Sequence, residues 1–271
     1  MWTLLFLGRI IFVSFPAHAS FSQDYLRRLQ VAVAHAEDAA LEGPVIVWLA
    51  GNRMIFDVPA GIKFVPVEPA NELLELLGDD HLKSEGLLLP VAGFNAELWV
   101  ISIQWWDIGF SSDERNARQS PDFVLHSFKG TEPHLNVARR RIGLSDAHVR
   151  GLLQNPIYDS SEHYQDYAVD LKIDGSEEHF VMYIRNIFGR EGFISLSFIG
   201  PTRSPEDIRA ILNPISDAAH FTEGHQYGDF NSARDKAVHT GPYVLPLWLK
   251  SIAGCVVAGV VFYGKRTWRR K

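Results

Sequence analysis

Three carboxylates after an aromatic stretch are the first residues of this 271-residue chain that could do chemistry. Asp107, Asp113 and Glu114 lie close together in the sequence. Two such groups could act as a general acid and a general base, or they could bind Ca²⁺ weakly. A surface loop that is simply solvated explains the same pattern, and we prefer that interpretation.

An aromatic and polar segment near the C-terminal end is the second candidate. Its residues are Tyr227, Asp229, Phe230, Asn231 and Asp235. They could form an interaction surface or couple the body of the protein to the segment that follows. Alternatively, Asp229 or Asn231 caps a following helix, because short polar side chains accept hydrogen bonds from the free N–H groups of a first helical turn. We favour capping.

Two further charged clusters lead to simple structural interpretations. Arg190 and Glu191 lie in a glycine-flanked turn, where we expect local salt bridges. Residues 139–141 are consecutive arginines, which point around a helix and predict a surface helix rather than a phosphate or lipid site. The sequence contains no zinc-protease, nucleophile-elbow, Walker or dinucleotide-binding motif. We therefore predict no catalytic residue, no metal ligand and no cofactor, and the sequence leans against an enzyme.

Charge separates the body of the chain from its C-terminal end. All 32 acidic residues lie between residues 20 and 242, together with 19 of the 26 basic ones, so this part carries −13. Nucleic-acid binding needs clustered Lys and Arg that displace counterions from phosphates. The acidic body therefore predicts no nucleic-acid partner.

The N-terminal residues 1–19 resemble a secretory signal peptide. An apolar stretch is broken by Pro16 and ends in Ala17-His18-Ala19, which fits a small-x-small cleavage site. Arg9 departs from the pattern because it splits the apolar stretch. The alternatives are an uncleaved N-terminal anchor and a buried helix. The sequence does not tell whether the peptide is cleaved.

Residues 243–263 are predicted to be a transmembrane helix. A helix needs about 20 apolar residues to cross a bilayer, and this segment contains one charged residue, Lys250. The basic residues of 264–271 predict a cytoplasmic tail by the positive-inside rule. Gly254 and Ala258 lie on a small-residue face that could pair two copies as a homodimer. A buried C-terminal helix is the alternative.

In the body, residues 20–242, several stretches alternate apolar and polar residues, and helical stretches lie between them. This pattern predicts an antiparallel sheet flanked by helices, which is the α+β class. In 167–173, for example, apolar residues alternate with polar ones and predict a strand with one buried face. The expected helices are 22–41, 68–77, 120–142 and 204–213. The helix 120–142 should begin at Ser120 and break near Gly130 and Pro133. The expected strands are 45–49, 54–58, 63–67, 98–106, 167–173, 179–186 and 192–199.

Four stretches in order along the chain resemble motifs of the bacterial membrane-anchored domain-of-unknown-function 2167 family. They are WWDIGFSSDE in 105–114, in which Gly109, Phe110, Asp113 and Glu114 are in register, PIYD in 156–159, GREGFISL in 189–196 and YGDFNSARDKA in 227–237. The resemblance covers residues 42–265 and implies a secreted domain held in a bacterial envelope membrane by one C-terminal helix. It implies no activity. Parts of the chain also resemble PsbP/Mog1-like sandwiches, which are binding modules.

These observations predict a single-pass protein of the bacterial inner membrane with its body in the periplasm. The body should act as a binding or scaffolding module, with an envelope protein or a small ligand as its partner. The alternative is a membrane-anchored envelope hydrolase that uses acidic residues. A hydrolase predicts convergent titratable groups in a polar cleft, whereas a binding module predicts an exposed apolar or aromatic patch.

Overall fold

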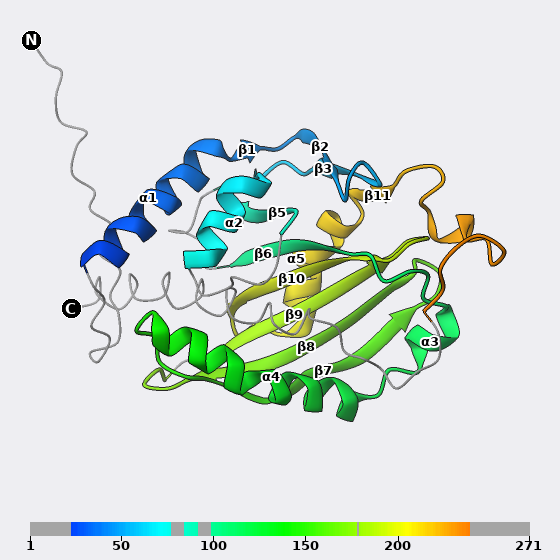
Figure 1. Cartoon of the computed structure of the whole chain (residues 1–271). Helices are drawn as coiled ribbons and strands as arrows, with labels where there is room; N and C mark the ends of the chain where they lie inside the picture. The colour runs from blue at the N-terminus through cyan, green and yellow to red at the C-terminus, as the bar shows by residue number, and fades with distance from the viewer. Residues whose placement is uncertain (1–22, 77–83, 92–98, 178, 239–271) are drawn as a thin grey trace, which may run out of the picture.

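The large sheet of the computed structural model consists of eight antiparallel strands. The structure describes residues 23–76, 84–91, 99–177 and 179–238 (Figure 1). Across the sheet the strands are β1 (Leu41–Glu42), β4 (Ile62–Val65), β5 (Gly86–Pro90), β6 (Val100–Trp106), β10 (Phe193–Pro201), β9 (His179–Phe188), β8 (Tyr164–Ile173) and β7 (Ala147–Asp159). A smaller sheet contains β11 (Ala219–Phe221), β3 (Met54–Val58) and β2 (Val45–Leu49).

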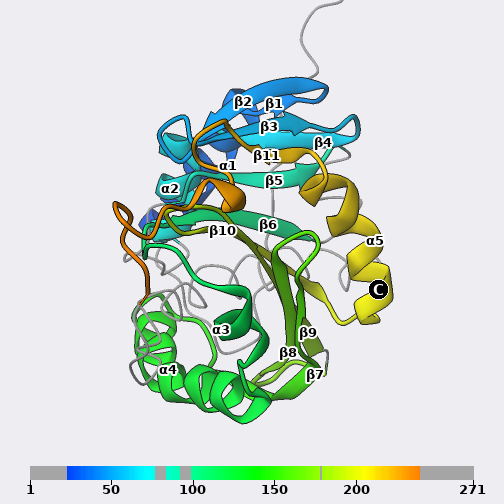
Figure 2. The same cartoon turned by 90° about the vertical axis from the view of Figure 1, so that its right-hand side faces the viewer.

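Both faces of the large sheet are covered, so the molecule has two hydrophobic cores. Helices α1 (Gln23–Ala39), α2 (Val67–Leu76) and α4 (Pro121–Arg141) cover one face, which we call the α4 face. Helix α5 (Pro205–Ser216) and the small sheet cover the opposite α5 face (Figure 2). Strand β9 illustrates the division, because Met182 packs in the core of the α4 face and Tyr183 in that of the α5 face.

Helix α4 does not break at Gly130 or Pro133, contrary to the sequence prediction. It begins as expected, with the Ser120 side chain accepting a hydrogen bond from Phe123 N at 3.1 Å, but it runs without interruption to Arg141. A proline inside a helix costs about 3 kcal/mol. Pro133 is exposed, and the turns on both sides bury apolar residues against the sheet, including Phe128 and Leu135. Tertiary packing therefore outweighs the local cost.

Most of the predicted strands and helices are confirmed, and the fold class is α+β. Strands β1, β5, β7 and β11 and the short helix α3 (Asp113–Ala117) were not predicted. The expected acidic loop is therefore partly helical, with Ser112 as the N-cap of α3. Arg139 was expected on a helix surface, but it is buried and donates from Nε to Ser145 O at 2.6 Å.

None of the helices formed by the described residues is long and apolar enough to span a membrane. The predicted signal peptide in 1–19 and the predicted span in 243–263, with Gly254 and Ala258, lie outside the described residues. The same holds for the basic tail in 264–271.

His148 on β7 joins helix α4 to the turn between β8 and β9. Its Nδ1 lies 2.7 Å from a carboxylate oxygen of Glu132, and its Nε2 lies 3.3 Å from one of Asp174. The hydrogen bond to Glu132 is the largest cause that raises the pKa of His148 above its ordinary value of 6.5. Partial burial opposes this effect and Asp174 adds to it.

We predict that His148 stabilises the fold at acidic pH and loses this effect as the pH rises. A histidine with a raised folded-state pKa contributes fully below its unfolded pKa and stops contributing above its folded pKa. Replacement of His148 by Gln should therefore lower the free energy of unfolding more at pH ~5.5 than at pH ~8.5. These two pH values lie about one unit below and about two units above the ordinary pKa of histidine. The difference should be below about 1 kcal/mol, because the side chain is 38% exposed. Urea titrations at both pH values measure it, with exposed His134→Gln as the control. An equal loss at both pH values would contradict the prediction.

Candidate functional site

Residues 227–238, which we call the strap, cross one end of the large sheet beside α3 (orange in Figure 1). The strap forms an isolated parallel bridge between Ala237 and Phe110. Phe110 N donates to Lys236 O at 2.9 Å, and Val238 N donates to Phe110 O at 2.8 Å. Gly109 has φ +90°, and a Cβ there would lie 2.6 Å from Lys236 O. The close approach of the two backbones therefore requires glycine at this position.

Aromatic rings hold the first half of the strap. Phe110 stacks on Phe230 with ring centroids 3.8 Å apart and an interplanar angle of 9°. Tyr227 lies between Phe110, at 4.7 Å, and His163, on which it stacks at 3.8 Å. The strap begins in a short 3₁₀ helix, Tyr227–Asp229, which orients these rings. The contacts bring together side chains that are far apart in the sequence.

Asp113 lies beneath this aromatic stack and accepts hydrogen bonds. The Tyr158 hydroxyl donates to its carboxylate at 2.5 Å, and His163 Nδ1 lies 3.2 Å from the same oxygen. Burial raises the pKa of Asp113, but hydrogen bonds from Tyr158, Tyr227 and His163 outweigh it, and the pKa lies below 3.8. Burial, together with the bond to Asp113, raises the pKa of Tyr158 to about 12.

Arg190 binds the second half of the strap. Its guanidinium donates to both carboxylate oxygens of Asp235, at 2.7 and 2.8 Å, and to Gly224 O at 2.8 Å. Such a two-point pair fixes direction as well as distance. The hydrogen bonds from Arg190, followed by the one from the backbone of Asn231, lower the pKa of Asp235 to about 2.

Glu191, the neighbour of Arg190, holds two other segments. Its carboxylate lies 2.7 Å from Arg53 Nε and 3.0 Å from His225 Nδ1. Burial raises the pKa of Glu191. The hydrogen bonds from Arg53 and His225 lower it by more than burial raises it, so the net pKa is below 4.5. The local salt bridges expected for this turn are thus long-range contacts, because the partners of Arg190 and Glu191 lie 34 to 138 positions away.

The glycines on either side of this pair permit close packing. A Cβ at Gly189 would lie 2.7 Å from the Phe221 ring, and a Cβ at Gly192 would lie 1.8 Å from Trp106 O. No side chain fits in the latter space. The turn that presents Arg190 and Glu191 is therefore fixed against the end of β6.

Asp229 and Asn231 each make a local capping contact in or next to the strap. Asp229 Oδ2 accepts from Gln226 N at 2.9 Å and so closes the 3₁₀ turn. Asn231 Oδ1 accepts from Ala233 N at 3.0 Å. Any helix beyond Val238 lies outside the described residues.

Seven of the eight candidate residues belong to this site, and Glu114 does not. Glu114 is exposed and pairs with Arg118, the C-cap residue of α3. Sequence reasoning missed Tyr158 and His163 as members. Tyr158 was visible in the PIYD stretch, whereas His163 has φ +51° in a tight turn and gave no sequence signal.

The arrangement is suited to holding a segment in place rather than to acid–base catalysis. A general acid or base works best with a pKa near the working pH, but the pKa values of Asp113 and Asp235 are lowered and that of Tyr158 is raised. The residues that the structure describes contain no cluster of three His, Cys, Asp or Glu that could bind a metal ion.

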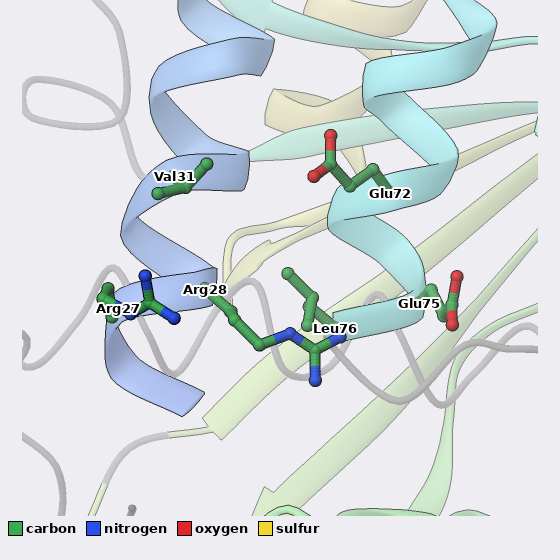
Figure 3. Close-up of a pocket in the computed structure, with 6 residues that line it drawn as sticks. All are labelled: Arg27, Arg28, Val31, Glu72, Glu75 and Leu76. Carbon is green, nitrogen blue, oxygen red and sulfur yellow. The ribbon is translucent and has the colours of Figure 1, made fainter. Parts of the chain in front are cut away.

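A cavity of about 210 Å³ lies elsewhere, between α1 and α2 (Figure 3). Arg27 is paired with Asp24 at 3.0 Å, and Glu72 with His35 at 2.7 Å. These charges are paired along the helix surfaces and do not converge on a reacting group. The lining residues are Arg27, Arg28, Val31, Glu72, Glu75 and Leu76.

We predict that Asp113→Asn lowers the free energy of unfolding by about 1 kcal/mol. The charged acceptor of the Tyr158 hydroxyl is lost, and the effect is at the low end for a charged hydrogen bond because Asp113 is 48% exposed. The control is Glu114→Gln, which should cost less than about 0.5 kcal/mol. Denaturant unfolding of both variants measures the difference. A simple solvated loop would leave both variants equal to the parent protein.

Comparison with known proteins gives one family and several structures. A family model described as a protein of unknown function, DUF2167, matches residues 42–258. The search of curated proteins found no match. Among solved structures, cyanobacterial PsbP (CyanoP) from Synechocystis sp. PCC 6803 is 12% identical with a TM-score of 0.40. The match covers 66% of this chain and 92% of the CyanoP chain. The Ran-binding protein Mog1p of Saccharomyces cerevisiae is 12% identical with a TM-score of 0.35. That match covers 70% of this chain and 100% of the Mog1p chain.

Proposed function

We propose that this chain, which belongs to the DUF2167 family, is a membrane-anchored binding or scaffolding module. In this proposal residues 1–19 direct export and residues 20–242 form a body in the periplasm. Residues 243–263 anchor it in the bacterial inner membrane, and 264–271 remain in the cytoplasm. Apolar length and the basic tail support this topology.

The observation that carries the proposal is the strap, which is held along its whole length. Ring stacking holds Phe230, the Arg190 guanidinium holds Asp235, and backbone hydrogen bonds hold Lys236 and Val238. Val238 lies five positions before the proposed span begins at residue 243. A chain fixed so close to the anchor presents the body in a restricted orientation, whereas a long flexible linker would not.

Binding explains the site better than the alternative, a membrane-anchored hydrolase that uses acidic residues. A hydrolase needs a carboxylate or histidine free to exchange a proton with substrate. Asp113 accepts from Tyr158, Asp235 is paired with Arg190, and His163 is stacked under Tyr227. Loss of a biological phenotype in Asp113→Asn with an unchanged melting curve would favour the hydrolase.

The partner that we propose for the body is an envelope protein or a small ligand. Either one fits a binding body, and the acidic charge of residues 20–242 disfavours nucleic acid. Two copies could associate through the small-residue face of Gly254 and Ala258.

We predict a cytoplasmic C-terminus in the living cell. A reporter that is active only in the cytoplasm should work when fused after Lys271, because the basic tail favours retention on that side. A reporter that is active only in the periplasm should fail at the same position. The opposite pair of results would overturn the topology and, with it, the proposed function.

We predict that Arg190→Met exposes the strap to protease. Arg234 and Lys236 are exposed trypsin sites, but their backbone is held in place by Arg190 and Phe110. Without the guanidinium, trypsin should release the body from membranes several-fold faster. The matched control is Arg118→Met, which removes the exposed ion pair between Glu114 and the C-cap residue of α3. Equal release from the parent, Arg190→Met and Arg118→Met proteins would show that Arg190 does not hold the strap.

A further inference from the structure

Strand β2 forms one edge of the small sheet and lies at the outer rim of the molecule (Figure 1 and Figure 2). Its side chains alternate. Val47 and Leu49 pack in the core of the α5 face, whereas Ile46 and Trp48 are 61% and 57% exposed. Residues two positions apart on a strand share a face, so Ile46 and Trp48 present an apolar surface to solvent. On β3, Ile55 lies opposite Trp48 in the strand register and extends this surface.

The outward-facing backbone groups of this edge belong to the same two residues. In an antiparallel ladder the N–H and C=O of one residue point to the same side, and those of the next residue point to the other side. Asp57 N donates to Ala218 O, next to β11, at 2.9 Å, so Asp57 points away from β2. Its register partner Ile46, and Trp48 two positions further on, therefore direct their N–H and C=O groups away from β3. The described part of the chain places no strand on that side.

The other edges of the two described sheets are protected against strand pairing, and β2 is not. Proteins protect edge strands by keeping them short or by placing bulges, prolines and charges on them. Strands β1 and β11 have only two and three residues. The pairing of β7 with β8 shifts register three times, and β7 carries Arg150 and Pro156. Strand β2 has five uncharged residues and a continuous register with β3.

Charge indicates what kind of strand fits this edge. Asp57 is the direct register partner of Ile46, so the two side chains share the outer face of the small sheet. The Asp57 side chain is exposed, and no basic side chain of the described residues pairs with it. A basic side chain on an added strand can extend over Ile46 toward this carboxylate. A second copy of this chain fits less well, because each body carries −13 and two such bodies repel each other.

We propose that β2 binds an extended segment of another envelope protein, which joins the small sheet as a further strand. The segment alternates apolar residues and has basic ends. Backbone hydrogen bonds to Ile46 and Trp48 supply affinity, and the exposed side chains together with Asp57 supply specificity. This inference rests on the proposed binding function and names the kind of partner and its surface. The topology of the chain is independent of it, so the reporter fusions after Lys271 test the proposed function separately.

The test is a titration of the full chain, kept in an uncharged detergent, with three end-blocked and fluorescently labelled heptapeptides. The first has lysine at both ends and alternates valine with threonine between them. The second has glutamate in place of both lysines, and the third keeps the lysines but has two adjacent prolines at its centre. By fluorescence anisotropy the lysine peptide should bind saturably and at least tenfold more tightly than either of the others. Its binding should also slow the deuterium exchange of residues 44–50.

Variants of exposed residues test the surface itself. Ile46→Pro removes an N–H that points away from β3, and Trp48→Thr removes apolar surface. Each should weaken binding of the lysine peptide at least tenfold. Asp57→Asn should reduce the preference for the lysine peptide over the glutamate peptide several-fold. The matched control is Ile157→Thr on β7, which is 54% exposed and lies on a protected edge, so the affinity should stay unchanged.

Three results would overturn the proposal. The first is that the lysine peptide does not bind, or that the proline peptide binds equally well. The second is that Ile46→Pro and Trp48→Thr bind the lysine peptide as tightly as the parent protein. The third is that sedimentation without peptide shows dimers of the parent protein that Ile46→Pro dissociates, because the strand added to β2 would then come from a second copy.

Discussion

The register of the four central strands, β6, β10, β9 and β8, is the constraint on which the rest of the structure depends. These strands are buried on both faces, so a shift of one residue would exchange the two sets of side chains. The clearest consequence is the pair of Asp166 and Arg185, which are direct partners in the β8–β9 register. The guanidinium donates to both carboxylate oxygens, at 2.8 and 2.6 Å, on the α5 face. After a shift, each charge would face an apolar core, at a cost of several kcal/mol.

The same register brings the strap site together. The hairpin between β9 and β10 places Arg190 and Glu191 at the end of the sheet, because Gly192 admits the Trp106 carbonyl beside it. The β7–β8 turn ends at the same edge, where Phe188 N donates to His163 O at 2.9 Å. Four stretches that resemble family motifs thus meet where strands end, and most of their polar side chains hold the chain rather than face solvent.

Sequence periodicity predicted the strands but not what covers them. Alternation in 167–173 indicated one buried face, yet Asp166 and Ala168 on the opposite face are also buried, beneath α5 and the small sheet. Burial of Asp166 depends on Arg185, 19 positions away, which no local pattern reveals. Strand β7 escaped prediction because its pairing with β8 shifts register three times, near Gly151 and Pro156 among other points. The candidate residues could be selected from motifs, but their partners could not, since ion pairs across 45 or more positions arise only from the fold.

Charge states in the strap site argue for a fixed geometry. The contacts of the site lower the pKa values of Asp113 and Asp235, and burial with the bond to Asp113 raises that of Tyr158, so each pKa moves further from neutrality. Near neutral pH both carboxyls are ionised and the hydroxyl is protonated. A catalytic centre commonly shifts pKa values toward the working pH, whereas a structural contact shifts them away from it. The hydrogen bonds from Gln165 on β8 through Asn116 and Ser111 to Tyr227 then join the central sheet to the strap. The strap is therefore tied to the central sheet by side-chain and backbone hydrogen bonds as well as by ring stacking, and none of these contacts needs a change of protonation near neutral pH.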